Sequence, residues 1–243
     1  MHPIKKTARI AGALYVSTVP IALFAWSYVP GKLIVRGNAT ATAENVLSHE
    51  TLFRLAILAD LVGFVIFICL GFALYRLLRD VDRIWAVVML GFVLVSGAVG
   101  FLNSLNNIAA VTLFRGADFL VALEKPQRDA LAMLFLRLHG QGSVINEIFW
   151  GVWLFPFGWL VFRSGFLPRF LGIWLMINCF GWLAVSVAGL FFPPYSDAIY
   201  RYAQPILFGE MAIMLWLLIR GANVASIPAA ISASNSSVPA TQL

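Results

Sequence analysis

Charged residues are scarce in this sequence: Asp, Glu, Lys and Arg make up only 12% of its 243 residues, while 61% are hydrophobic. Soluble globular domains carry about 25% charged residues and about half apolar ones. The mean hydropathy of +0.88 therefore excludes an ordinary soluble domain and indicates a membrane protein. The length fits one compact domain and leaves no room for a second.

Cysteine is equally rare. Cys69 and Cys179 both lie inside apolar runs and form no C-x-x-C pair, so neither a disulfide framework nor a metal site is indicated. The recognisable catalytic motifs are missing as well. His49 and Glu50 lack the second histidine of a zinc-binding helix, and neither a G-x-S-x-G motif nor a nucleotide-binding loop is present. We expect no metal and no cofactor.

Long apolar runs dominate what remains. Each is close to or above the ~20 residues that an α-helix needs to cross a ~30 Å hydrocarbon core. Because backbone groups cannot stay unpaired in lipid, such runs form helices. The fold is therefore predicted to be an all-α polytopic transmembrane bundle of about six spans: Ile10–Val29, Leu55–Leu78, Ile84–Leu113, Gly140–Phe162, Phe170–Phe192 and Gln204–Ile219. The first run is too long for a cleaved signal peptide, and we expect it to be retained.

The distribution of charge predicts the orientation. The net charge of +6 includes no basic cluster dense enough for nucleic acid, so no nucleic-acid partner is expected. The N-terminus, the turns after the second and fourth spans and the end of the last span are rich in basic residues, which favours a cytoplasmic location for both termini. These residues are Lys5, Lys6, Arg9, Arg76, Arg79, Arg83, Arg163, Arg169 and Arg220, against Asp80 and Asp82.

The remaining segments lie outside the spans. Lys125–Leu138 begins with Pro126 and has an apolar stripe, and Ala43–Phe53 has a weaker one. Both are predicted to be short amphipathic helices at the outer interface or over the bundle. We expect residues 1–220 to form the single transmembrane domain. Residues 221–243, rich in Ala, Ser and Pro, are predicted to be disordered.

Three carboxylates lie inside predicted spans: Asp60, Glu147 and Glu210. Intramembrane charges are costly, usually face the bundle interior and often mark a function. Each lies a few residues after the outer start of its span, and Asn103, Asn106 and Asn107 fall at about the same depth when counted from the outer end of the third span. We therefore predict one polar layer in the outer half of the membrane.

Helical spacing strengthens this prediction. His139, Ser143, Asn146 and Glu147 share one face of the fourth span, because they recur at one- and two-turn intervals. Arginine and histidine side chains lie at the outer ends of these spans. The candidate polar pocket comprises Arg54, Asp60, Asn103, Asn107, Arg137, His139, Asn146, Glu147 and Glu210. The tryptophans, among them Trp26 and Trp174, are read as interfacial and packing residues.

Several short strings resemble a known family. They are R-x-x-G-x-x-Y at Arg9–Tyr15, H-E-x-x-F-R at His49–Arg54 followed by Asp60, L-H-G at Leu138–Gly140, and R-S-G-F-L-P-R at Arg163–Arg169. The chain resembles, from about residue 7 to about 218, a bacterial family catalogued as domain of unknown function 4386. The resemblance implies a multi-pass protein of the bacterial inner membrane with no assigned activity, and a recurring pattern that includes Arg54, Asp60 and His139.

Three functions remain open. The polar pocket could bind or conduct a small molecule or ion. A membrane-embedded enzyme could act on a lipid or amphiphile near the outer surface, using His139 with Asp60 or Glu147. The polar groups could also only bond one another in a structural or sensory subunit. Whether the protein is an enzyme is left open. Membrane lipid is an expected partner, and a homo-oligomer is compatible with the short length.

Overall fold

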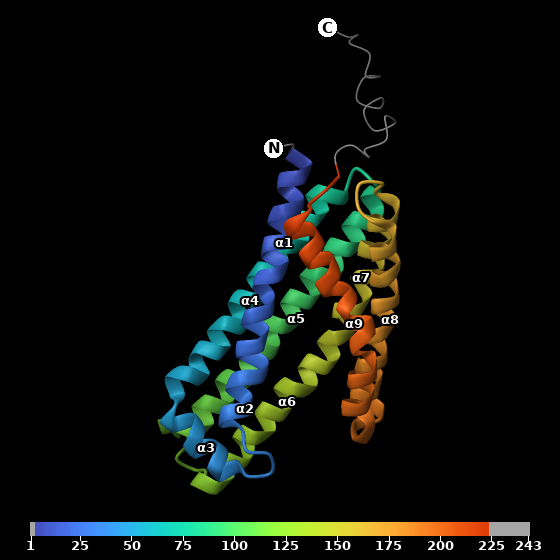
Figure 1. The fold of residues 1–243 in the computed structure, drawn as a ribbon. Coiled ribbons are helices and arrows are strands. Elements are labelled where there is room, and N and C mark those ends of the chain that lie inside the picture. The colour runs from blue at the N-terminus through green and yellow to red at the C-terminus, as the bar shows by residue number, and fades with distance from the viewer. Residues whose placement is uncertain (1–2, 224–243) are drawn as a thin grey trace.

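The computed structural model describes residues 3–223, and every regular element within this range is a helix (Figure 1). The elements, in chain order, are α1 (Pro3–Ala22), the π-helix η1 (Leu23–Tyr28), α2 (Val29–Leu33), α3 (Ala39–Ser48), α4 (Glu50–Leu78), α5 (Arg83–Arg115), the 3₁₀ helix η2 (Asp118–Leu120), α6 (Lys125–Val152), α7 (Leu154–Arg163), α8 (Arg169–Phe191), the 3₁₀ helix η3 (Pro193–Tyr195) and α9 (Ser196–Ile219).

The predicted number of spans is confirmed. Within residues 3–223, 6 helical segments are long and apolar enough to cross a membrane. Their outward faces carry large apolar side chains, for example Leu102 and Phe180, which are 67% and 62% exposed. Exposed apolar surface of this extent is unusual for a soluble protein and is expected where lipid surrounds the bundle.

Three of the predicted boundaries are wrong. Lys125–Leu138 is not a separate interfacial helix, because α6 continues without interruption from Lys125 to Val152. The predicted span Gly140–Phe162 is interrupted at Trp153, between α6 and α7. Pro156 explains this interruption, since proline has no N–H to donate to the carbonyl of Val152 and its ring crowds that group. The predicted segment Ala43–Phe53 is divided between α3, which ends at Ser48, and α4.

The start of the predicted tail packs against the bundle. Ala222 is buried, and the backbone N–H of Asn223 donates to the carbonyl of Phe166 at 3.0 Å. Gly221 has a φ of 68°, a left-handed conformation that glycine adopts without strain and that ends α9. The rest of the predicted tail, residues 224–243, lies outside the described residues.

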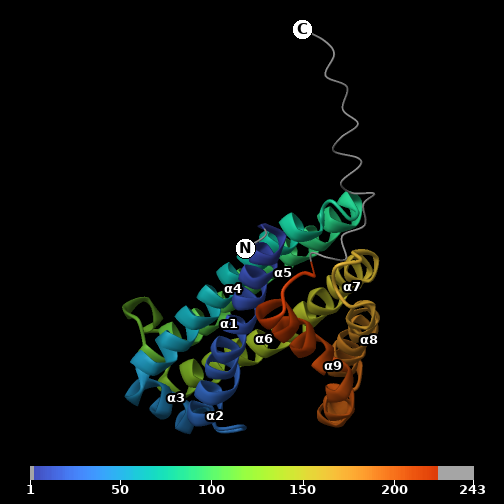
Figure 2. The ribbon, with the colours of Figure 1, turned by 45° about the horizontal axis from the view of Figure 1, so that its top comes forward.

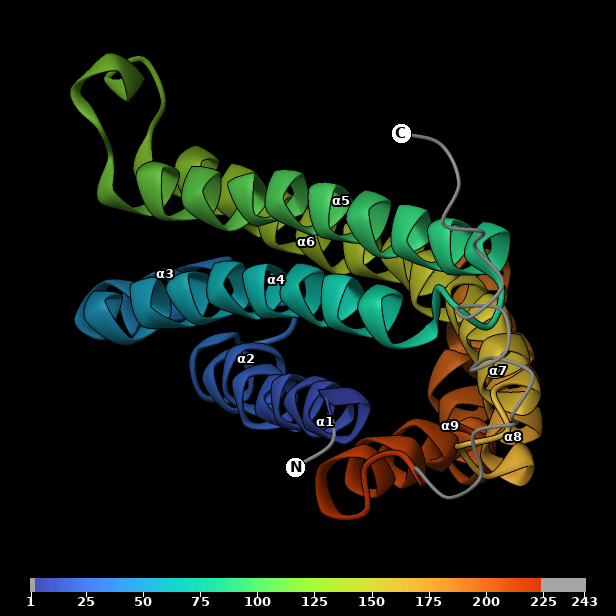
Figure 3. The same ribbon diagram turned by 90° about the horizontal axis from the view of Figure 1, so that it is seen from above.

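The spanning helices close into a ring. Each packs against the next in the order α1, α4, α5, α6, α8 and α9, and α9 returns to α1. Viewed along the bundle, α7, α8 and α9 lie together on one side, and α4, α5 and α6 extend away from them (Figure 3). The tilted view shows α1 beside α4 (Figure 2).

Helices α1 and α9 are tightly joined at only one end. A Cβ at Gly12 would lie 2.3 Å from the backbone nitrogen of Leu218, so only glycine fits this contact. Near it, the Arg9 guanidinium donates to the carbonyl of Ile219 at 3.0 Å, so the two ends of the described chain lie on the same side. Beyond this contact α1 and α9 diverge toward the other end of the bundle (Figure 1).

The hydrophobic core is divided into two clusters along the bundle. The cluster nearer the termini includes Tyr15, Leu70 and Trp153. The cluster at the far end, around α2 and α3, includes Val29 and Phe53. Polar residues of α4, α5 and α6 lie along the chain between members of the two clusters. The candidate functional site lies in this intermediate zone.

Candidate functional site

A polar cavity of about 330 Å³ lies in this zone, between η1 and α2, α4, α5 and α6. Four residues of the predicted pocket line it: Asp60, Asn107, His139 and Glu147. Ser143 lines it as well, together with aromatic and aliphatic side chains that include Trp26, Phe53, Leu136 and Trp150. Three different spans thus bring carboxyl, amide and imidazole groups to one space.

Asp60 is held in place by two donors from other elements. The side chain is buried, and the indole N–H of Trp26 donates to its Oδ1 at 2.8 Å. The hydroxyl of Ser104, on α5, donates to its Oδ2 at 2.9 Å. Each carboxylate oxygen can accept a further hydrogen bond. Asp60 is therefore oriented but retains acceptor capacity toward the cavity.

Glu147 differs from Asp60 in having no such partner. Its Oε2 atom is buried and has no hydrogen-bond partner among the described residues. Leaving a buried acceptor unsatisfied costs about 1–3 kcal/mol, and burying a charged one costs more. Glu147 is thus the polar group of the cavity that most requires a partner from outside the protein.

His139 has one ring nitrogen committed to the backbone. Its Nδ1 lies 3.2 Å from the carbonyl oxygen of Asn103. A carbonyl only accepts, so Nδ1 carries the proton. In the neutral ring Nε2 is then an acceptor. Within the described chain, no direct hydrogen bond joins this ring to the carboxyl group of Asp60 or Glu147.

A second, largely apolar cavity of about 360 Å³ lies beside the first, enclosed by α1 and η1, α4, α6, α8 and α9. Glu210 lines this cavity rather than the polar one. Both of its carboxylate oxygens have a donor from the protein, since the Tyr15 hydroxyl donates to Oε2 and the Trp182 indole N–H donates to Oε1 at 2.6 Å. Glu210 therefore joins α1, α8 and α9, and it does not share a space with Glu147.

A pair of stacked tryptophans lies where the two cavities adjoin. Trp26 and Trp150 stack with ring centroids 5.0 Å apart and an interplanar angle of 15°, and both residues line both cavities, as do Ala25 and Asp60. The Trp150 ring also meets Trp182 edge-on at 5.5 Å. We call the stacked pair Trp26–Trp150 the aromatic partition.

This partition is not evident from the sequence. Trp26 is expected there to be an interfacial or packing residue, whereas its indole N–H donates to Asp60. Trp26 lies in the π-helix η1, which begins three residues after Pro20. A proline inside a helix removes a backbone hydrogen bond, and π-helical turns occur frequently at functional sites. The proline was the available signal, but it does not specify the direction in which Trp26 points.

Two predicted pocket residues fasten α5 to α6 instead. Asn146 is buried, accepts from the Ser96 hydroxyl at 3.1 Å and donates to the Ser96 carbonyl at 3.3 Å. Asn103 donates to the His139 carbonyl at 2.8 Å. A Cβ at Gly142 would lie 2.1 Å from Asn103 Oδ1, which shows how closely the two helices approach. These amides fix the register of the helix pair.

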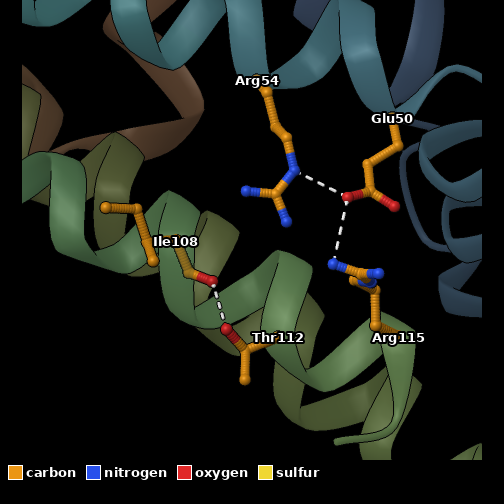
Figure 4. A network of polar contacts seen from close by, with 5 residues as sticks. All are labelled: Glu50, Arg54, Ile108, Thr112 and Arg115. Carbon is orange, nitrogen blue, oxygen red and sulfur yellow. Dashed lines mark hydrogen bonds and ion pairs between the residues drawn. The ribbon is translucent and has the colours of Figure 1, made fainter.

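The two predicted arginines lie outside both cavities. Arg54 Nε donates to Glu50 Oε1 at 2.6 Å, and Arg115 reaches the same oxygen at 3.6 Å, which links the start of α4 to the end of α5 (Figure 4). Arg137 is exposed on α6. Among the described residues, no lysine or arginine lines either cavity. No group of three or more His, Cys, Asp or Glu in the described range could hold a metal ion.

Comparison with known proteins gives a family without an assigned activity. The profile described as Domain of unknown function (DUF4386) matches residues 10–221. A protein of Archaeoglobus fulgidus, named only as an uncharacterized protein, is 32% identical over 83 residues, which are 34% of this chain and 48% of that protein. The match thus spans about half of that relative. No solved structure matches the chain.

Proposed function

The chain belongs to the family described as Domain of unknown function (DUF4386), and we propose that this multi-pass membrane protein binds a small cationic ligand in its polar cavity. The single observation that carries the proposal is the Glu147 side chain: the residue lines the cavity, and its buried Oε2 atom has no hydrogen-bond partner among the described residues. A cation would compensate this carboxylate: a protonated amine by hydrogen bond and charge, and a quaternary ammonium by charge alone.

The chemistry of the lining favours a cation over an anion. Asp60 and Glu147 are both acidic, and within residues 3–223 the cavity lining contains no Lys or Arg. An anionic headgroup or a phosphate would meet two carboxylates and, among the described residues, no basic side chain apart from the His139 imidazole, and like charges repel strongly at low dielectric. Trp26 and Trp150 also line the cavity, and indole rings attract organic cations through cation–π contact.

The basic residues at one end of the bundle support a particular orientation of the protein in the membrane. Arg163 and Asp82 form an ion pair at 3.5 Å. The turns from α4 to α5 and from α7 to α8 lie at the same end of the bundle as the start of α1 and the end of α9 (Figure 1). Under the positive-inside rule this end is cytoplasmic. The polar cavity then lies in the outer half of a bacterial inner membrane. Fusion of green fluorescent protein to the C-terminus tests this orientation: fluorescence is expected, and its absence from a folded, expressed fusion contradicts it.

Ligand binding is tested with full-length protein in lipid nanodiscs. Thermal unfolding is measured with tetraethylammonium and choline as probes, because a ligand at 100 times its Kd stabilises the folded state by about 2.7 kcal/mol. The wild type is expected to be stabilised. Glu147→Gln is expected to lose this response, whereas Glu44→Gln, which alters an exposed acid on α3, is expected to retain it.

Two results would overturn the proposal. One is a wild-type protein that neither ammonium probe stabilises. The other is a folded Glu147→Gln variant that responds to the probes as strongly as the wild type, since the carboxylate would then have no part in binding.

A further inference from the structure

The apolar cavity opens between α1 and α9. Lining residues on both sides of this opening are themselves exposed: Leu23 and Trp26 on η1 are 59% and 42% exposed, and Tyr200, Phe208 and Met211 on α9 are 45%, 52% and 42% exposed. A side chain that both lines a cavity and is exposed marks its mouth. The mouth is therefore formed mainly by apolar and aromatic side chains of η1 and α9, and the ribbons of α1 and α9 diverge in this direction (Figure 1).

This mouth is closed on the side of the termini. There α1 and α9 touch at Gly12, and the Tyr15 hydroxyl bonds Glu210 across the two helices. The helices separate only beyond these contacts. The opening consequently lies part of the way along two membrane spans, where the surroundings are lipid hydrocarbon rather than water. We call this opening the α1–α9 wedge.

The wedge leads to the aromatic partition and to Asp60. Ala25, Trp26, Asp60 and Trp150 line both cavities, so the apolar cavity and the polar cavity adjoin along these residues. Taken together, the two cavities have an apolar half that opens to lipid and an acidic half with aromatic walls inside the protein.

We propose that the two cavities together form a site for a hydrophobic organic cation, whose ammonium group lies beside Glu147 and Asp60 and whose hydrocarbon portion occupies the α1–α9 wedge. This proposal rests on the binding function proposed above and specifies the class of ligand. The acidic lining without Lys or Arg in the described range selects a positive head. The apolar mouth selects a tail that reaches the site laterally from the bilayer.

The alternative occupants differ in chemistry. An anionic phospholipid would bring its phosphate to two carboxylates, which is unfavourable. A small hydrophilic cation would fill the polar cavity and leave the wedge to lipid. The experiment therefore compares cations that share a headgroup and differ only in the tail.

The probes are tetramethylammonium and an octyltrimethylammonium that carries a diazirine at the end of the tail, added to full-length protein in nanodiscs. After illumination, mass spectrometry locates the labelled residues. Labels are expected on the wedge residues Leu23, Phe208 and Met211, and an excess of unlabelled octyltrimethylammonium should remove them. Stabilisation by tetramethylammonium reports on the polar cavity alone.

Two filling variants and one control locate the tail. Ala22 and Met211 both line the wedge, so Ala22→Phe and Met211→Trp are expected to abolish competable labelling there while tetramethylammonium still stabilises the protein. Leu58→Phe adds bulk on an exposed face of α4 that lines neither cavity and is expected to leave labelling unchanged. Two filling variants are used so that one misfolded protein does not decide the result.

The outcomes separate the two proposals. If tetramethylammonium stabilises the wild type but the tail labels only outward-facing residues such as Leu102 and Phe180, or labels the wedge without competition, the lateral amphiphile site is refuted and cation binding stands. If neither cation stabilises the wild type or competes for a label, the cation-binding function itself fails.

Discussion

Asn146 and Glu147 are consecutive residues of α6, yet their side chains differ in whether the protein supplies hydrogen-bond partners. Asn146 is buried against α5, with both its amide oxygen and its amide nitrogen bonded to Ser96. Glu147 faces the polar cavity with one buried oxygen unpartnered. Both looked alike in sequence, as polar residues inside a span. The comparison teaches that a buried polar side chain in a membrane is a candidate for ligand binding when the protein itself does not satisfy it.

The same contrast applies to two other buried carboxylates, Asp60 on α4 and Glu210 on α9. Glu210 receives bonds from Tyr15 and Trp182, so its role is explained by the packing of α1, α8 and α9. Asp60 receives bonds from Trp26 and Ser104 and also lines both cavities. Asp60 is therefore intermediate: it is positioned by the protein and is still available to a ligand.

The largest expected effect comes from Glu147→Gln. Tetraethylammonium has no N–H to donate, so its attraction to the Glu147 carboxylate is electrostatic. Opposite unit charges about 4 Å apart attract by about 1 kcal/mol in water and about 4 kcal/mol at an effective dielectric constant of about 20, so removing the charge should weaken binding of tetraethylammonium by about 10- to 100-fold. Isothermal titration in nanodiscs measures the change. An affinity within twofold of the wild type would remove the distinction between Glu147 and Asn146.

Asn146→Ala should act on stability instead. Loss of two interhelical hydrogen bonds, with Ser96 left partly unpaired, is expected to lower the free energy of unfolding by roughly 1–2 kcal/mol while the affinity for tetraethylammonium is retained. Unfolding of the variant in lipid, alone and combined with Ser96→Ala, measures the coupling. Additive effects of the two substitutions would contradict a direct Asn146–Ser96 interaction.

Glu147→Leu should have the opposite effect on stability. It replaces an unsatisfied buried acid with an apolar side chain, and such replacements are often neutral or stabilising, so a gain of up to about 1 kcal/mol is expected together with loss of ligand binding. Thermal unfolding without ligand measures it. A clear loss of stability would indicate that Glu147 has a partner in the protein and, like Asn146, stabilises the helix packing.

The smallest effect is expected for Arg54→Gln. The Arg54 side chain is 53% exposed in its pair with Glu50, and exposed ion pairs contribute only about 0.2–1 kcal/mol. Neither cavity is lined by Arg54, so ligand affinity should not change. Unfolding measures the small change in stability, and titration measures the ligand affinity. A loss of affinity would mean that the site extends to the start of α4.

Hydropathy alone was sufficient to predict the six spans, because lipid leaves the backbone no alternative to helices. The same constraint made Asp60 and Glu147 stand out as candidate site residues, since intramembrane carboxylates are costly. The boundaries were less predictable. Whether Lys125–Leu138 forms its own helix or extends α6 depends on packing against α5 and α3, which periodicity does not report.

The partners of the polar groups could not be predicted from the sequence. The indoles of Trp26 and Trp182 bond Asp60 and Glu210 across 34 and 28 residues of chain, and no spacing rule connects positions on different helices. For the same reason the sequence grouped Asn146 with Glu147, although only one of them faces the cavity. Which face a polar residue presents to a neighbour is decided by the helix order around the ring.

The most direct test of the account is an experimental structure in lipid with (2-bromoethyl)trimethylammonium, whose bromine is located by its anomalous signal. Ammonium density is expected in the polar cavity, beside the carboxylate of Glu147 and against the Trp26–Trp150 partition, with bromine density absent from this position in Glu147→Gln. A polar cavity without the probe, or Glu147 Oε2 paired with another group of the protein itself, would contradict the central claim.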